Sequence, residues 1–238
     1  MSTRPAVAWS HSAIEMFENC PRKYWAVKIG KVVSDDNANN IQGDDEHKLL
    51  EKSLKTGKPL GKETVRIDLM GNTAVIDMSN MNPTLDRLRA APGEKFYEYQ
   101  MTLDQQFVPC GWKDWNKAWV RVASDLLIVN QSLATYIDWK SGKFRKSDEQ
   151  IETAALLVFR HFPHVQTMKG GLYYYRQNKI HARVVHRAEE PALWQDRMRR
   201  VKAIEQAKAT DNWPATPNPL CAWCPYAGCP SNTNPKVK

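Results

Sequence analysis

Two apolar runs joined by a short polar turn constrain the fold of this chain more than any other feature. In ASDLLIVNQSLATYIDWKSGK (123–143), the runs LLIV and ATYI flank Gln131-Ser132. Two short runs rich in β-branched residues, with a two-residue turn between their strands, predict an antiparallel β-hairpin. A turn at Gln131-Ser132 places Asp125 directly opposite Asp138. The chain is therefore expected to build a sheet in which two carboxylates face each other.

Facing carboxylates need a compensating positive charge. Side chains directly opposite on paired strands lie about 4.5–5.5 Å apart at Cβ, and like charges there are destabilising. Mg²⁺ and Mn²⁺ prefer carboxylate oxygens and would relieve the repulsion. Lys140 lies two residues after Asp138 and projects from the same face, while Trp139 points away. The alternative is a plain surface salt bridge between Asp138 and Lys140.

The remaining pattern predicts an α/β protein. We expect Ser12 to cap the first helix, with Glu15 completing a capping box, and a polar connection over 34–44. A Gly stop ends the second helix, and Pro92-Gly93 forms a turn. The expected helices are 10–30, 46–57, 83–90, 148–162 and 191–209, the expected strands 95–103, 118–130 and 133–141, and a further hairpin lies at 171–186.

Charge indicates the kind of partner. The chain has 34 Lys and Arg against 26 Asp and Glu, a formal net charge of +8. This balance favours a polyanion such as nucleic acid, with a merely basic surface as the alternative. The tyrosines at 173–175 are candidates for stacking on unpaired bases, although strand alternation favours core packing for at least one. Residues expected to contact phosphates are Arg22, Lys23, Arg197, Arg199, Arg200 and Lys202.

No segment predicts membrane association or export. The longest strictly apolar run, AALLVF (154–159), is far too short to span a bilayer. The N-terminal MSTRPAVAW lacks the apolar core of a signal peptide. We therefore expect a cytoplasmic protein.

Three of the five cysteines lie close together near the C-terminus, in NPLCAWCPYAGCP (218–230). An odd number of cysteines without an export signal argues against a disulfide framework and favours a thiolate site. Such a site usually has four ligands, and Cys20 and Cys110 are rivals for the fourth position beside Cys221, Cys224 and Cys229. Both zinc and an iron–sulfur cluster accept four thiolates, so spacing alone leaves the metal open.

These motifs resemble the PD-(D/E)XK nuclease superfamily. Asp125 followed by IDWK (137–140) is similar to its catalytic core. The chain resembles most its RecB-type exonuclease branch, which includes the iron–sulfur CRISPR-associated nucleases and the AddB nuclease domain. The resemblance covers almost the whole chain. SHSAIEMFENCPRKY is similar to the opening segment of the branch, GDDEHKLLE to its histidine-bearing helix, EQIETAALL to its glutamine helix and CAWCPYAGC to its closing cluster segment.

The resemblance implies a restriction-endonuclease-like core, with a central mixed sheet flanked by helices. It implies that Asp125 and Asp138 bind a catalytic Mg²⁺ or Mn²⁺, with His47 as a further ligand. Lys140 would orient the attacking water and stabilise developing charge. Gln150 corresponds to the glutamine of the branch, but Ala154 stands where that motif usually has tyrosine.

The resemblance also selects among the cysteines. It implies that Cys20 is the fourth ligand, that the site holds a [4Fe–4S] cluster rather than structural zinc, and that Cys110 is a free thiol. Such a site would join the terminal helical segments over the core. We expect one nuclease domain over 1–238: an N-terminal helix with the first cluster cysteine (1–33), the nuclease core (34–190), and the C-terminal helix and cluster segment (191–238).

The expected function is metal-dependent hydrolysis of DNA. By family analogy, the substrate is single-stranded or free-ended DNA, in replication, recombination, repair or CRISPR adaptation in a prokaryotic or phage-infected cell. No motor motif is present, so strand separation would need a helicase or recombination partner. Two roles stay open for Glu98, which either supports the metal site or faces solvent. The alternative function is a DNA-binding accessory subunit with a vestigial nuclease site.

Overall fold

The computed structural model describes residues 8–32, 37–235 and 237, without the side chains of 37–40. Residues 1–7, considered above for a signal peptide, lie outside the described residues. The chain divides into two compact units, and each is described by itself. The terminal unit comprises the described residues of Met1–Asp35, Gln100–Val122 and Ala188–Lys238, and the sheet unit comprises those of Asp36–Tyr99 and Ala123–Arg187.

Both units combine chain segments that are distant in sequence. The terminal unit holds the helices α1 (His11–Asn19), α2 (Pro21–Tyr24) and α6 (Glu190–Thr210). The sheet unit holds α3 (Asn37–Thr56), α4 (Asn82–Ala90), α5 (Asp148–His161), β1 (Lys62–Arg66), β2 (Thr73–Asp77), β5 (Leu133–Trp139), β6 (Thr167–Tyr174), β7 (Lys179–His186) and most of β3 (Glu94–Leu103) and β4 (Val120–Asn130).

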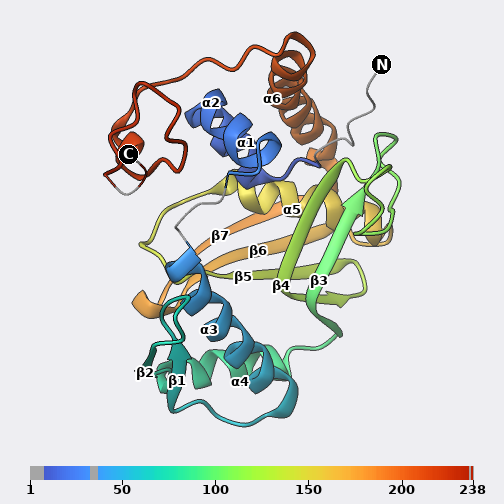
Figure 1. The fold of residues 1–238 in the computed structure, drawn as a ribbon. Helices are drawn as coiled ribbons and strands as arrows, with labels where there is room; N and C mark the ends of the chain where they lie inside the picture. Colours follow the sequence, from blue (N-terminus) through green and yellow to red (C-terminus); the bar gives the residue numbers. More distant parts are fainter. Residues whose placement is uncertain (1–7, 33–36, 236, 238) are drawn as a thin grey trace. The chain divides into compact units, whose positions relative to one another are not determined.

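A five-stranded sheet in the order β3-β4-β5-β6-β7 forms the centre of the fold (Figure 1). The β4–β5 and β6–β7 pairs are antiparallel, while β5 and β6 run parallel, so the sheet is mixed. Helix α5 connects the two parallel strands, as such a crossover requires. The expected α/β class with a mixed central sheet flanked by helices is confirmed.

The β4–β5 hairpin has the predicted register. Leu126 pairs with Ile137, and the pairing continues to Asn130 and Leu133 around Gln131-Ser132. Gln131 takes a φ of +50°, in the left-handed region that tight hairpin turns use. Because this register continues toward the carboxylates, residues 125 and 138 are the next facing pair.

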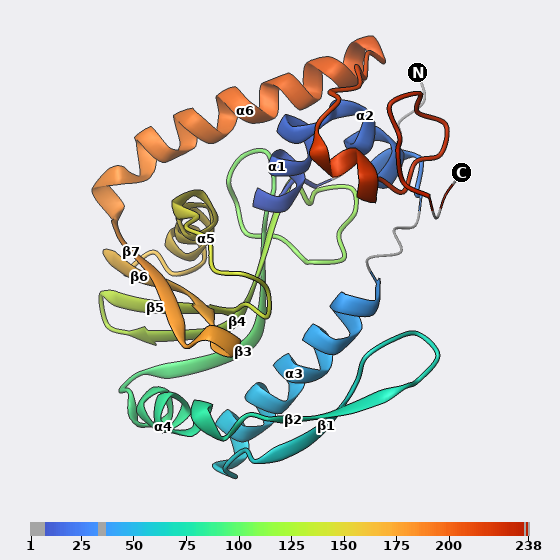
Figure 2. The same ribbon diagram turned by 90° about the vertical axis from the view of Figure 1, so that its left-hand side faces the viewer.

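The sheet unit packs helices on both faces of its strands. On one face, a buried cluster joins Leu50 of α3 and Leu85 of α4 to Leu126 and Trp139 of the sheet. On the other face lies α5 (Figure 2), whose Ile151 packs directly over Gly170 of β6. A Cβ at Gly170 would lie 2.1 Å from a methyl of Ile151, so only glycine lets α5 approach this closely. Burial on both faces explains why β4 and β5 are apolar over most of their length.

Three local predictions were wrong. The first helix is capped by Ser10, whose Oγ accepts from the main-chain N–H of Ala13, rather than by Ser12. That helix ends at Asn19 because Cys20 precedes proline and is extended, so 10–30 is not one helix. Helix α3 begins at Asn37, so the described part of the expected polar connection is helical.

The structure also contains an antiparallel hairpin that the sequence reading missed. Strands β1 and β2 pair from Lys62 with Asp77 to Arg66 with Thr73. The hairpin packs beside α3, as Figure 2 shows. Its strands have only five residues each, and their alternation is too short to separate from a loop.

Two surface predictions were wrong because the residues are buried. Tyr173, Tyr174 and Tyr175 are at most 8% exposed and belong to the interior, so they are unavailable to stack on bases. Arg197 is 1% exposed and does not reach the surface.

Within the described residues, no helix is both long and apolar enough to cross a bilayer.

Candidate active site

Asp125 and Asp138 lie just beyond the Leu126–Ile137 pair of the β4–β5 ladder, each with a side chain 14% exposed. The main-chain N–H of Trp139 donates to Asp125 Oδ2 at 2.5 Å, which fixes the Asp125 carboxylate against β5. Trp139 itself points into the cluster formed with α3 and α4. The facing carboxylates therefore follow directly from the hairpin register and the alternation of side chains.

Lys140 is in contact with this pair. Its Nζ lies 2.7 Å from Asp138 Oδ2, and its main-chain N–H donates to Tyr173 O of β6 at 2.9 Å. The lysine is held at the end of β5 by the neighbouring parallel strand. Its side chain is 30% exposed, so the ammonium group is open to solvent on one side.

Asp138 Oδ1 is held by two further donors. Gln150 Nε2 donates to it at 3.0 Å and the Tyr136 hydroxyl at 3.2 Å. Gln150 comes from α5, whose close approach is set by Ile151 over Gly170. Burial raises the pKa of Asp138; the Lys140 charge opposes this, and the Asp125 charge adds to it. An added positive charge at this position would favour the ionised carboxylate.

His47 is brought to the site by α3. Its Nδ1 lies 3.3 Å from Asp125 Oδ1, and its ring meets that of Tyr175 edge-on with centroids 6.3 Å apart. Burial lowers the pKa of His47, but the hydrogen bond and charge of Asp125, with smaller contributions from Asp138 and Glu98, raise it overall. The histidine that the resemblance selected thus lies at the carboxylate pair.

The residue beside His47 anchors the helix. Glu46 is fully buried, and it accepts hydrogen bonds from the Tyr175 hydroxyl, the Arg176 guanidinium and the Gln42 amide. Burial, followed by the hydrogen bond to Glu46, raises the pKa of Tyr175. Sequence reasoning missed this network because Tyr175 and Arg176 lie more than a hundred residues from Glu46.

Glu98 on β3 belongs to the same electrostatic cluster. Its pKa is raised to about 7, first by burial and then by the charges of Asp125 and Glu51, while His47 and Lys55 oppose the shift. Its backbone φ is +48°, an uncommon value for a residue other than glycine. The left-handed backbone at Glu98 could not be predicted from the sequence, because FYEYQ (96–100) has the regular alternation of an ordinary strand.

The two carboxylates and the imidazole are chemically suited to bind a divalent cation, but the structure does not arrange them around one metal position. Two carboxylates and an imidazole are a suitable set for Mg²⁺ or Mn²⁺. Among the residues that the structure describes, however, no three His, Cys, Asp or Glu side chains are arranged to hold a metal ion. Asp138 Oδ2 instead faces Lys140, and Asp125 Oδ1 faces His47.

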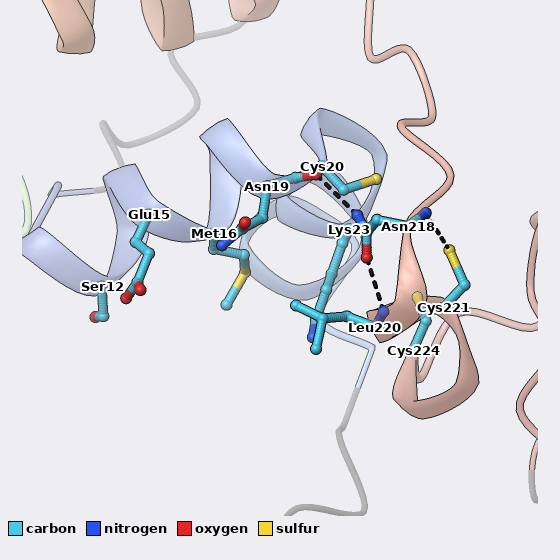
Figure 3. Close-up of a pocket in the computed structure, with 10 residues that line it drawn as sticks. All are labelled: Ser12, Glu15, Met16, Asn19, Cys20, Lys23, Asn218, Leu220, Cys221 and Cys224. Atoms are coloured by element: carbon cyan, nitrogen blue, oxygen red, sulfur yellow. Dashed lines mark hydrogen bonds between the residues drawn. The ribbon is translucent and has the colours of Figure 1, made fainter. Parts of the chain in front are cut away.

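The predicted cluster cysteines all belong to the terminal unit. Cys20, Cys221 and Cys224 line one pocket of about 260 Å³, as Figure 3 shows. The main-chain N–H groups of Thr216 and Asn218 donate to the sulfurs of Cys20 and Cys221 at 3.4 and 3.5 Å. All five cysteines are free thiols, and in the described chain they form no metal centre. The rival Cys110 does not line this pocket.

The fold and the Asp–Asp–Lys arrangement define a class of protein. The model of the PD-(D/E)XK nuclease superfamily matches residues 8–229, and the chain belongs to this superfamily. Membership implies a nuclease, a hydrolase of phosphodiester bonds. No curated protein matches the chain.

Proposed function

We propose that the protein is a Mg²⁺- or Mn²⁺-dependent deoxyribonuclease. The observation that carries this proposal is the group of Asp125, Asp138 and Lys140 on one face of β4 and β5, with His47 in contact with Asp125. Opposed carboxylates beside a lysine suit a nuclease site better than a structural role, because two buried like charges are costly without a cation. The resemblance to the RecB-type branch supports exonuclease action on single-stranded or free-ended DNA.

Each residue has a separate task in the proposed reaction. Asp125, Asp138 and His47 would hold the cation, which when bound polarises the scissile phosphate. The Lys140 ammonium group orients the attacking water and stabilises the negative charge that develops on the phosphate oxygens. Gln150 and Tyr136 donate to Asp138 Oδ1 and keep the carboxylate oriented, while Asp138 Oδ2 lies 2.7 Å from Lys140 Nζ.

We further propose a [4Fe–4S] cluster, with structural zinc as the alternative, bound by Cys20, Cys221, Cys224 and Cys229. Three of these line one pocket, and main-chain N–H groups already face two of the sulfurs. A four-thiolate site would require the Cys229 side chain to approach these three cysteines. Replication, recombination, repair or CRISPR adaptation in a prokaryotic or phage-infected cytoplasm is the proposed setting, with a helicase or recombination protein as partner.

Cleavage of labelled DNA by purified protein tests the proposal. End-labelled single-stranded DNA should shorten in Mg²⁺ or Mn²⁺ and stay intact in EDTA. A circular single strand of the same sequence separates exonuclease from endonuclease action, because only an endonuclease opens it. If the wild-type protein binds DNA and cleaves it in neither metal, the result favours the accessory subunit with a vestigial nuclease site. Ala154, which stands where the family motif usually has tyrosine, supports that alternative.

A further inference from the structure

Two loops bring positive charge to one edge of the sheet. Strands β5 and β6 run parallel from Leu133 with Thr167 to Trp139 with Tyr173, so their carboxyl ends lie at the same edge. The segments that follow them, 140–147 and 175–179, contain six basic residues and no acidic one. We call this set the basic edge: Lys140, Lys143, Arg145, Lys146, Arg176 and Lys179.

The main chain of the first loop is pinned to the second. Gln177 accepts from the main-chain N–H of Phe144 at 3.1 Å and donates to the carbonyl of Gly142 at 2.6 Å. The hydroxyl of Tyr174 donates to the carbonyl of Arg145 at 2.8 Å. These bonds hold the loop through its main chain and do not involve the side chains of Lys143 and Lys146.

Three cationic side chains of the basic edge project to solvent. Lys143, Lys146 and Lys179 are exposed, and within the described part of the chain Lys143 and Lys146 make no ion pair. Lys179 lies over the ring of Phe144, with Nζ 5.7 Å from the centroid. Exposed ammonium groups on an ordered loop can bind phosphates at little entropic cost, because the loop is already held in place.

The three arginines predicted on α6 are less suited to this task, whereas Lys202, the fourth basic residue predicted there, is exposed. Arg197 is buried, and Arg199 is paired with Asp196. Arg200 is 14% exposed and paired with Glu18. Asp196 or Glu18 pairs with each of these arginines within the terminal unit. Lys143 and Lys146, by contrast, follow Lys140 within six residues.

We propose that the basic edge binds the phosphate backbone of a single DNA strand next to the scissile phosphate at Lys140. This inference rests on the proposed nuclease function and names the surface that holds its substrate. Backbone contacts of this kind release counterions, so binding is independent of base sequence and weakens steeply with salt.

The salt dependence of binding tests the proposal. We compare wild-type protein, Lys143→Gln/Lys146→Gln and Lys202→Gln/Lys208→Gln, measuring affinity for labelled single-stranded DNA in EDTA from about 50 to 200 mM salt. Lys202 and Lys208 are exposed on α6, so the control pair loses the same charge. Removing two phosphate contacts should flatten the plot of log affinity against log salt by about 1.4. The control should keep the wild-type slope.

Two results would overturn the proposal: a wild-type slope for the Lys143 and Lys146 variant, or equal flattening in both variants. If the wild-type protein cleaves DNA and the loop variant keeps its slope, the inference fails alone. If wild-type protein never cleaves DNA, the nuclease function fails, and the slopes still decide whether the basic edge binds the strand.

Discussion

Lys140 and Asp138 are in contact, but the proposed reaction gives them different roles. In the proposed reaction the lysine would be one of several basic residues that contact DNA, and its Nζ lies 2.7 Å from Asp138 Oδ2. We expect Lys140→Gln to lower the single-turnover cleavage rate by about 100-fold or more. Removing one preorganised hydrogen-bond donor that stabilises transition-state charge typically lowers the rate by about this factor. DNA affinity, measured separately in EDTA, should change by less than about threefold. Affinity that fell as far as the rate would make Lys140 a binding residue.

Glu98 gives the site a pH dependence that can be measured without DNA. Its pKa rises from an ordinary value of 4.5 to about 7 on folding, so the folded protein binds its proton more tightly than the unfolded chain. The contribution of Glu98 to stability is therefore fully present below about pH 4.5 and is lost as the pH rises to about 7.

Thermal unfolding in metal-free buffer compares wild-type protein with Glu98→Gln. The melting temperature of the wild type should fall relative to that of the variant between about pH 4.5 and 7, by a few degrees, because solvent screening reduces the effect. Parallel curves for the two proteins over this range would show that Glu98 does not titrate as its surroundings indicate.

At the scale of elements, the β4–β5 hairpin was predictable because two local signals agree. The two-residue spacing at Gln131-Ser132 sets the register, and the alternation around Asp138 sets which side chains share a face. Together they locate the Asp125, Asp138 and Lys140 constellation. The contact of His47 with Asp125 depends on how α3 packs, so only the family resemblance pointed to it.

Other elements were mispredicted for identifiable reasons. A helix pattern continues through 10–30, but Pro21 forces Cys20 out of the helical region and divides it. Strand alternation predicts core packing for at least one of the tyrosines at 173–175, yet all three are buried. Tyr173 and Tyr175 join the cluster with α3 and α4, and Tyr174 packs against Phe144. Long-range partners such as Glu46 with Arg176 leave no local trace in the sequence.

The start of α1 gives a matched pair of variants. Ser10 accepts from the main-chain N–H of Ala13, whereas Ser12 lies within the helix and is exposed. Ser10→Ala should lower the free energy of unfolding by about 1 kcal/mol, the usual cost of a lost N-cap. Ser12→Ala should change it by less than about 0.5 kcal/mol. Equal losses of unfolding free energy in the two variants, measured by urea denaturation, would contradict the assignment of the cap to Ser10.

At the scale of the whole molecule, the two ends of the chain meet within the terminal unit. Arg200 of α6 forms a bidentate pair with Glu18 of α1, and Trp213 stacks on Tyr24 with centroids 5.9 Å apart. The Asn218 side chain donates to the carbonyl of Asn19 at 3.1 Å. The ends are therefore joined by ordinary contacts, and a metal bound at the cysteines would add to a contact that exists without it.

Metal content tests the proposed cluster. Protein purified without oxygen should be brown and contain about four irons per chain if the four-thiolate assignment holds. Cys20→Ser should lose the colour and lower the melting temperature, because the added link between the chain ends is gone. Cys110→Ser is the control and should keep both. Colourless protein with one zinc per chain would show that the site holds structural zinc rather than a [4Fe–4S] cluster. Loss of colour in Cys110→Ser alone would assign the fourth ligand to Cys110.

The central claim is that the carboxylate pair on β4 and β5 is the hydrolytic site, and Asp138→Asn tests it most directly. Asparagine keeps the size of the side chain and its carbonyl acceptor, so the hydrogen bonds from Gln150 and Tyr136 can persist. Melting temperature in metal-free buffer should be unchanged or raised by about 2–4 °C, because burial disfavours the charged carboxylate. Under single-turnover conditions with Mn²⁺ and labelled single-stranded DNA, we expect wild-type protein to cleave and the folded variant to bind the DNA without cleaving it. Cleavage by Asp138→Asn at a rate within about tenfold of the wild type would contradict the account.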